Sequence, residues 1–125
     1  MEETQYVRAF YKTGVYIAEL LDKQEENGRV LVKVVAVLKH PMQGDLHNPK
    51  MVNVAYFHQR KALAEFEKTW VPLSSIKTYT EPIPQYKLSL QKAVEAQMVA
   101  LQEEGSEWAQ ECIEKLKECK REYGL

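Results

Sequence analysis

The stretch that decides the fold is Val30-Leu31-Val32-Lys33-Val34-Val35-Ala36-Val37-Leu38, which holds a single charged residue. Its β-branched side chains favour a strand, because they fit the pleated surface of a sheet. Successive side chains of a strand point to opposite faces. The even positions therefore form one apolar face, made of Val30, Val32, Val34, Ala36 and Leu38. Lysines interrupt the other face, so we predict a half-covered strand over 29–39 in an antiparallel sheet.

Other short apolar runs, separated by turn residues, surround this strand. We expect further strands over 6–11, 14–22, 51–57 and 62–71. Asn27-Gly28 predicts a hairpin before the central strand, because both residues tolerate the positive φ of a primed turn. The 62–71 run also contains good helix formers, but its Thr69-Trp70-Val71 ending favours a strand.

A proline and a polar turn follow this run. The residues from Pro72 to Ser75 predict one turn of 3₁₀ helix, and a last short strand follows it up to Tyr79. Five or six short strands with a 3₁₀ turn before the last are typical of a small SH3-like antiparallel β-barrel. We assign residues 1–80 to this barrel.

The composition changes near Thr80, and residues 81–125 are rich in Glu, Lys, Gln, Ala and Leu. One apolar stripe at helical spacing consists of Leu90, Val94, Met98 and Leu101, and a second of Cys112, Leu116, Cys119 and Tyr123. Between them Gly105 breaks the pattern and Ser106 suits a helix N-cap. We therefore predict a mainly β plus α protein, in which 81–125 form a C-terminal helical hairpin packed on the barrel. A coiled-coil dimer is the alternative for these helices, so we expect a monomer or a weak homodimer.

Length and charge restrict the class of protein. The chain has 125 residues and a formal net charge of −1, without the basic excess of a dedicated DNA-binding protein. The start of the sequence is acidic and polar, unlike a secretory signal, and no apolar run approaches the roughly 18–20 residues that span a bilayer. Cys112 and Cys119 are two helical turns apart, too far for a disulfide. We expect a cytoplasmic protein.

The sequence offers little for catalysis. We find no nucleophile elbow and no glycine-rich phosphate loop, and both cysteines lie on an apolar helical stripe where a buried thiol is inert. His40, Asp45 and His47 could be imagined around a metal, but their spacing matches no known site and no cysteine is close. We therefore expect no enzyme activity, no metal and no cofactor, and we interpret 40–50 as a binding loop.

A basic cluster follows the aromatic pair Tyr56-Phe57 and consists of His58, Arg60 and Lys61. Cations beside aromatic rings can hold RNA or single-stranded DNA by charge and stacking. The acidic tail opposes binding of a polyanion. Nucleic-acid binding is therefore the alternative function, and protein binding is favoured over it.

Three stretches resemble the kinase-associated protein B family of spore-forming bacilli. They are Val35-Ala36-Val37-Leu38-Lys39-His40-Pro41-Met42-Gln43-Gly44-Asp45-Leu46-His47-Asn48-Pro49-Lys50, Phe57-His58-Gln59-Arg60-Lys61-Ala62-Leu63-Ala64 and Ile83-Pro84-Gln85-Tyr86-Lys87-Leu88-Ser89-Leu90. The resemblance extends from about Tyr11 to Tyr123. It implies an SH3-like barrel with a helical hairpin, no enzyme activity, and a role as activator of a membrane sensor histidine kinase that feeds the sporulation phosphorelay.

Such proteins have been described as lipoproteins, whereas this sequence has no cysteine before Cys112. We therefore expect a cytoplasmic protein that is peripheral to the membrane through its kinase. The candidate contacts with that kinase are polar and aromatic residues of the loop and of the segment after it, since loops on small barrels are frequent recognition sites. They are His40, Gln43, Asp45, His47, Asn48, Phe57, His58 and Arg60.

Overall fold

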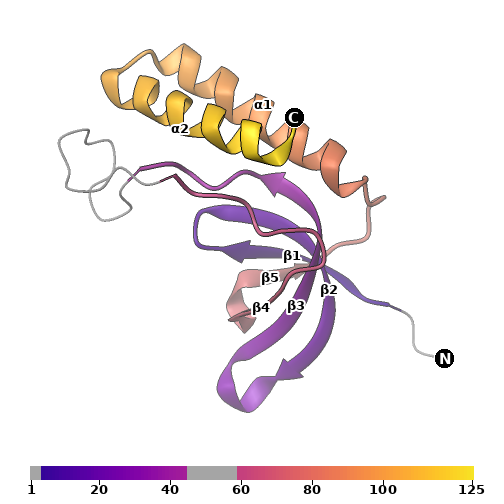
Figure 1. Cartoon of the computed structure of the whole chain (residues 1–125). Coiled ribbons are helices and arrows are strands. Elements are labelled where there is room, and N and C mark those ends of the chain that lie inside the picture. The colour runs from indigo at the N-terminus through magenta and orange to yellow at the C-terminus, as the bar shows by residue number, and fades with distance from the viewer. Residues whose placement is uncertain (1–3, 45–58) are drawn as a thin grey trace.

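The computed structural model describes residues 4–44 and 59–125, which form one antiparallel sheet and two helices (Figure 1). The strands are β1 (Tyr6–Tyr11), β2 (Gly14–Gln24), β3 (Arg29–Lys39), β4 (Lys68–Pro72) and β5 (Ile76–Thr78). The helices are α1 (Tyr86–Glu104) and α2 (Glu107–Tyr123), which lie side by side as a layer over one end of the sheet. This confirms the predicted mainly β plus α class with a C-terminal helical hairpin.

The five strands are arranged in the order β4-β3-β2-β1-β5, and all neighbours are antiparallel. The sheet curves, so that β4 also approaches β1 without pairing to it. Among the described residues the sheet has two free edges, β4 and β5, and closure into an SH3-like barrel stays a prediction. The predicted strand over 51–57 lies outside the described residues. The predicted 3₁₀ turn and last strand are confirmed, at Leu73–Ser75 and in β5.

The turn between β2 and β3 differs from the predicted primed turn. Gln24 and Arg29 still pair, and a single 3₁₀ turn over Glu25–Asn27 connects them. Only Gly28 has a positive φ, of 64°, and its N–H donates to the Glu25 carbonyl at 3.1 Å. A four-residue loop needs one left-handed residue at its end, rather than two in its middle. The hairpin prediction was therefore right in place and wrong in turn type.

The apolar face of β3 also differs from strict alternation. Val37 is buried and Leu38 is 38% exposed, the reverse of the expected pattern. The cause is irregular pairing at two places in β3. Ala36 pairs with Ile17 and Val34 with Ala18, and Val37 pairs with Tyr16 and Lys39 with Val15, which leaves Val35 and Leu38 as extra residues. The prediction that Leu38 belongs to the buried face is wrong for this reason.

The predicted strand over 62–71 is wrong in its first half, since β4 begins only at Lys68. The backbone of Leu63 hydrogen-bonds to side chains rather than to a neighbouring strand. Its N–H donates to the Tyr16 hydroxyl at 3.2 Å, and its carbonyl accepts from the Tyr86 hydroxyl. A turn at Phe66, with a φ of 67°, then brings the chain beside β3. Tertiary contacts thus override the local preference for a strand.

The predicted helical stripes are confirmed, and both face the interior. Leu90, Val94 and Leu116 pack with Tyr16 and Val37 of the sheet in one hydrophobic core. The helix boundary is also as predicted: Gly105 caps α1 with a φ of 66°, and the Ser106 hydroxyl accepts from the N–H of Ala109. Within the described parts of the chain, neither helix is long and apolar enough to cross a membrane.

A second core lies inside the curved sheet. Its buried members are Val7, Ala9, Ala18, Val30, Val32 and Val71, from β1 to β4. The two cores meet along β3, because Val32 belongs to the one and Val34 to the other. The end of β3 near Lys39 therefore leaves the sheet directly beneath the helices, and this is where the candidate site begins.

Candidate functional site

The structure places three of the eight predicted site residues. His40 and Gln43 are 0% and 3% exposed, so neither side chain faces a partner, and Arg60 is half-buried. The other five, Asp45, His47, Asn48, Phe57 and His58, lie outside the described residues. The expectation that His40 and Gln43 contact a partner directly must be corrected: burial makes them positioning residues.

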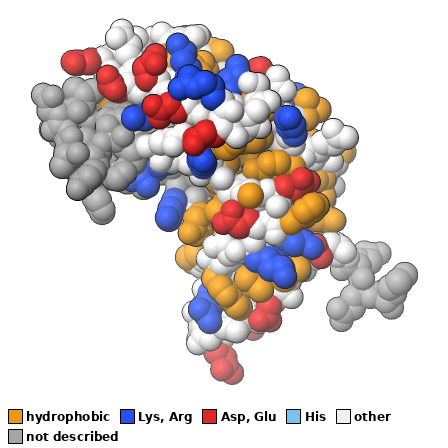
Figure 2. Space-filling view, in the orientation of Figure 1, with side chains coloured by type: hydrophobic (Ala, Val, Ile, Leu, Met, Phe, Trp, Pro, Cys, Tyr) orange, Lys and Arg blue, Asp and Glu red, His pale blue; other side chains and the backbone are white. Residues whose placement is uncertain are grey.

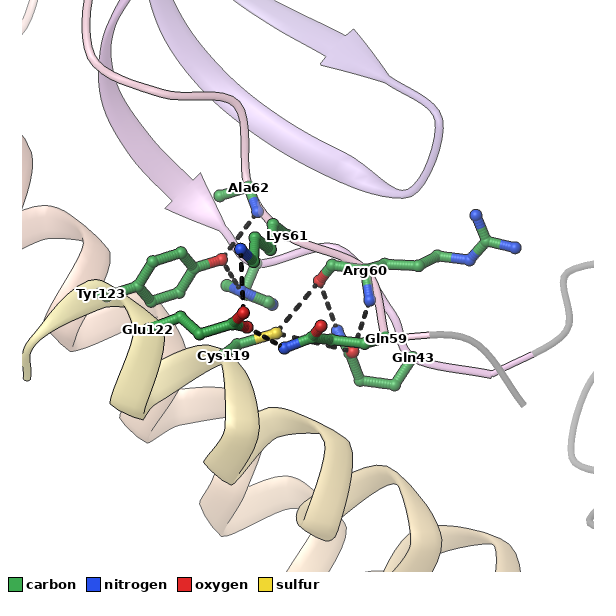
Figure 3. Close-up of polar contacts among 9 residues, drawn as sticks. Gln43, Gln59, Arg60, Lys61, Ala62, Cys119, Glu122 and Tyr123 are labelled. Carbon is green, nitrogen blue, oxygen red and sulfur yellow. Dashed lines mark hydrogen bonds and ion pairs between the residues drawn. The ribbon is translucent and has the colours of Figure 1, made fainter. Parts of the chain in front are cut away.

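The side chain of Gln43 links the two segments of chain that flank residues 45–58 (Figure 3). Its Nε2 donates to the Pro41 carbonyl at 3.0 Å and to the Arg60 carbonyl at 2.9 Å, and its Oε1 accepts from the N–H of Arg60 at 2.8 Å. Nε of Arg60 donates to the Gly44 carbonyl at 3.2 Å. We call these four residues, Pro41, Gln43, Gly44 and Arg60, the Gln43 clamp. Such fully satisfied buried polar groups fix one backbone geometry.

Tyr123, near the end of α2, joins the same two segments a few residues away. Its hydroxyl lies 2.9 Å from Nε2 of His40 and accepts from the N–H of Ala62 at 2.8 Å. His40 donates its Nδ1–H to the Pro41 carbonyl at 2.9 Å, because a carbonyl oxygen can only accept. Nε2 therefore accepts, and the Tyr123 hydroxyl donates to it. We call His40, Tyr123 and Ala62 the Tyr123 bridge.

Burial sets the protonation of the Tyr123 bridge. It lowers the pKa of His40 below its ordinary value of 6.5, only partly offset by the hydrogen bond to Pro41. It raises the pKa of Tyr123, so the phenol keeps its proton. Both groups are therefore neutral near pH 7, and the bridge consists of neutral hydrogen bonds in an interior that disfavours charge.

The surface beside the clamp contains a small charged cluster at the end of α2. Glu122 accepts from the side-chain amide of Gln59 and pairs with the ammonium of Lys61 at 3.3 Å. These hydrogen bonds, from Gln59 first and then Lys61, lower the pKa of Glu122. Because Glu122 partly neutralises Lys61, the basic cluster offers less positive charge to a nucleic acid than its sequence suggests.

The two cysteines lie behind the clamp and are free and buried, which confirms the predicted buried thiols. The Sγ of Cys119 is 3.5 Å from the Arg60 carbonyl, and that of Cys112 is 3.9 Å from the Gln43 carbonyl. Burial above all, and then Glu104 and Glu111, raise the pKa of Cys112 to about 12. A thiol that does not ionise near pH 7 is a poor nucleophile.

This arrangement of hydrogen bonds suits binding rather than catalysis. Both ring nitrogens of His40 are occupied by hydrogen bonds to the protein, so the ring has no lone pair for a metal. In the parts of the chain that the structure describes, no three His, Cys, Asp or Glu side chains gather as metal ligands.

Sequence reasoning missed the contribution of the helices to this region. Gln97 of α1 donates to the His40 carbonyl at 2.8 Å, and Ser89 accepts from the N–H of Val37 at 2.9 Å. The available signal was a polar residue close to an apolar helical stripe, as with Gln97 beside Val94 and Leu101. The helical spacing places Tyr123 on an apolar stripe but does not indicate the partners of its hydroxyl, His40 and Ala62.

Comparisons with known proteins agree over nearly the whole chain. The family model described as "Kinase associated protein B" matches residues 11–124. The "Kinase-associated lipoprotein B" of Bacillus subtilis (strain 168) is 45% identical over 122 residues, which are 98% of this chain and 94% of that protein. The crystal structure of kinase-associated protein B from Bacillus cereus matches this structure with a TM-score of 0.85 and 39% sequence identity. The match covers 100% of this chain and 99% of the Bacillus cereus chain.

Proposed function

This chain belongs to the kinase-associated protein B family, and on that premise we propose that it is a non-enzymatic regulatory protein. It binds a membrane sensor histidine kinase and activates it within the phosphorelay of sporulation. The family name supports association with a kinase. The identity of the kinase, the direction of the effect and the link to sporulation are our proposal.

The observation that carries this proposal is the Gln43 clamp. Every polar atom of the Gln43 side chain binds the protein itself: Nε2 binds two carbonyls, and Oε1 accepts from Arg60 N–H and lies 3.8 Å from Cys119 Sγ. The clamp thus fixes Gly44 and Arg60 beside each other, and the amide of Gln43 has no polar atom left to act on a substrate. A rigidly held pair of flanks is what a recognition segment on a small sheet protein requires.

The proposed contact surface lies beside these flanks. It consists of the half-buried Arg60, with the sequence-predicted residues Asp45, His47, Asn48, Phe57 and His58 between the two flanks. Activation requires that the protein binds the active state of the kinase more tightly than the inactive one. A difference of about 1–3 kcal/mol would change the ratio of the two states by about 5–150-fold.

We further propose that the protein acts on the cytoplasmic side and reaches the membrane through the kinase. The Bacillus subtilis relative is named a lipoprotein. In this chain the two cysteines are buried in α2 and are not placed to carry a lipid. Mass spectrometry of the protein from cells tests this point, since covalent lipid on either cysteine would contradict it.

The test of function is charge reversal at the clamp, Arg60→Glu, with Lys77→Glu on β5 as the matched control. Autophosphorylation of the kinase in membranes from sporulating cells is measured with and without the purified variant, and each variant is also melted. We expect Arg60→Glu to lose activation while Lys77→Glu retains it. Equal activation by both variants would contradict the proposed surface, and a melting temperature that falls with activity would make Arg60 a structural residue.

A further inference from the structure

The turn between β2 and β3 contains Asn27-Gly28, the only place in the sequence where Gly follows Asn. An Asn side chain loses its amide group most easily before glycine, because no Cβ hinders attack of the glycine nitrogen on the Asn side-chain carbonyl. Both residues are exposed, and a Cβ built on Gly28 would meet no atom within 4 Å. Packing within the described residues therefore leaves this pair open to water.

The turn forms the tip of the β2–β3 hairpin, at the lower end of the molecule in Figure 1. Its residues belong to neither hydrophobic core, and the 3₁₀ helix Glu25–Asn27 has no buried residue. Acidic side chains lie at this end of the molecule in Figure 2, and Glu25 and Glu26 directly precede Asn27. The tip can thus open without disturbing a core, and a further negative charge there would meet like charges.

Two hydrogen bonds hold the reacting groups in the closed turn. The N–H of Gly28 donates to the Glu25 carbonyl at 3.1 Å, and Nδ2 of Asn27 donates to Oε1 of Gln24 at 2.8 Å. While the Glu25 carbonyl holds its hydrogen, the Gly28 nitrogen cannot lose that hydrogen to a base and attack. The closed turn is therefore unreactive, and reaction requires that these bonds open.

Gln24 is itself held in place by Arg29. Nε of Arg29 donates to the same Oε1 at 3.1 Å, and the guanidinium lies over the Trp70 ring, 4.3 Å from its centroid. Oε1 of Gln24 thus accepts from Asn27 and from Arg29 at once, which uses both of its lone pairs. We call Gln24, Asn27, Arg29 and Trp70 the Gln24 network, and its stability determines how often the turn opens.

We propose that Asn27 is a site of spontaneous modification, converted to aspartate and isoaspartate in the open turn at a rate that the Gln24 network determines. Hydroxide takes the proton of the Gly28 N–H, and the nitrogen attacks Cγ of Asn27. The bond between these two atoms forms, the bond from Cγ to Nδ2 breaks, and ammonia leaves with a proton from water. Water then opens the succinimide ring at either carbonyl, which gives aspartate or isoaspartate. The inference goes beyond the proposed function and does not depend on it.

The products cannot keep the Gln24 network. A carboxylate at position 27 has no hydrogen to donate, so it faces Oε1 of Gln24 as a second acceptor. If the Gln24 amide turns over instead, its NH₂ group meets Nε of Arg29, which also only donates. Isoaspartate further lengthens the main chain before Gly28, whose carbonyl accepts from the N–H of Leu73 at 2.8 Å. Modification therefore loosens the tip of the hairpin and its contact with the 3₁₀ turn at Leu73.

The test measures isoaspartate by chromatography and mass spectrometry of the tryptic peptide 24–29, which Lys23 and Arg29 delimit. The full chain is incubated in mildly alkaline buffer, and in parallel in guanidinium, where the turn is open. Gln24→Ala removes the shared acceptor, and Arg29→Lys keeps the charge without the planar group that donates to Gln24 and covers Trp70. The matched control is Gln91→Ala, because the exposed amide of Gln91 also hydrogen-bonds within its own element, to Glu95 at 3.4 Å.

We expect the native protein to form isoaspartate measurably, but at least about tenfold more slowly than the unfolded chain. Gln24→Ala should raise the native rate by at least about fivefold and Arg29→Lys by at least about twofold, whereas Gln91→Ala should leave it unchanged. In guanidinium all four proteins should react alike.

Three results would overturn the proposal. They are equal rates in native and unfolded wild-type protein, no product in the native protein when the unfolded chain has reacted completely, and a native rate of folded Gln24→Ala that equals that of the wild type. Hydrogen exchange of the Leu73 amide in the separated isoaspartate form tests the consequence. We expect faster exchange than in the unmodified protein, and equal exchange would contradict the loosened contact.

Discussion

The hydroxyl of Tyr123 on α2 lies 2.9 Å from Nε2 of His40, 83 positions earlier in the chain and just beyond β3. This one hydrogen bond connects the last turn of the helical hairpin to the point where the central strand leaves the sheet. It forms in the interior, where His40 is fully buried, and it is therefore worth more than a contact at the surface. The stability of the candidate site depends on it.

Tyr123→Phe tests the Tyr123 bridge. Loss of the hydroxyl leaves the buried Nε2 of His40 and the half-buried N–H of Ala62 without a partner. A fully buried group costs about 1–3 kcal/mol when unsatisfied, and a half-buried one costs less because water can reach it. We expect the free energy of unfolding to fall by about 2 kcal/mol in urea denaturation. The control is Tyr79→Phe, whose exposed hydroxyl donates to the Pro82 carbonyl and should cost less than about 0.5 kcal/mol. Equal losses in the two variants would contradict the role of the bridge.

The same pair predicts a pH dependence of stability. Burial lowers the pKa of His40 in the folded protein below the value of 6.5 that the unfolded chain has. The unfolded state therefore binds the proton first, so stability is fully present above pH 6.5 and is lost as the pH falls through 6.5 toward the folded pKa. Urea denaturation between pH 8 and pH 5 measures this, with His40→Gln as the comparison. An unchanged pH profile in His40→Gln would contradict the assignment to His40.

Gln43→Met tests the Gln43 clamp with a side chain of similar size. The substitution leaves the carbonyl of Arg60 without its 2.9 Å partner and the N–H of Arg60 without its 2.8 Å partner, which costs about 1–3 kcal/mol per group. We expect a loss of stability that Gln102→Met, at an exposed position of α1, does not show. At a temperature where both variants are folded, only Gln43→Met should weaken kinase activation. Full activation by a folded Gln43→Met variant would show that kinase activation does not depend on the Gln43 clamp.

The buried thiols predict slow chemical modification. Cys112 has its pKa raised to about 12 by burial, and Cys119 is buried beside the Arg60 carbonyl. We expect Ellman's reagent to react with the native protein only as fast as α2 opens, and at once in guanidinium. Rapid reaction of either thiol in the native protein would show that this part of α2 is more accessible than the structure has it.

Local patterns predicted most of the fold. The ranges of β1 and β3 match the predicted ones residue for residue, and the Gly105-Ser106 boundary between the helices is where the capping residues put it. These features depend on the alternation of apolar and polar residues, on the helical spacing of apolar residues and on capping residues, all of which lie within one segment. The path of Ala62 and Leu63 could not be predicted in this way, because hydroxyls of Tyr16, Tyr86 and Tyr123 from distant elements bind their backbone.

The sequence grouped the candidate site residues around one loop, and their contact with a partner stays a prediction. Gln43 connects the other two described residues, because its amide donates to the Arg60 carbonyl and, like His40, binds the Pro41 carbonyl. Their burial was not predictable from a polar stretch with two prolines, since it depends on where α2 packs. Gln43 illustrates this. An amide in a loop is expected to be exposed, yet here its Oε1 accepts from the N–H of Arg60 and lies close to the thiol of Cys119.

The bulge in β3 also determines which changes in chain length this strand tolerates. Val37 stays opposite Tyr16 and Lys39 stays opposite Val15 whether or not a residue stands between them, because Leu38 has no partner of its own in β2. A deletion of Leu38 therefore removes this bulge and leaves every later residue in place, whereas a one-residue deletion within Val30–Val34, where each residue pairs with β2, would turn the following side chains to the wrong face. Position 38 is thus a point at which the central strand can be shortened without reversing its inside and outside.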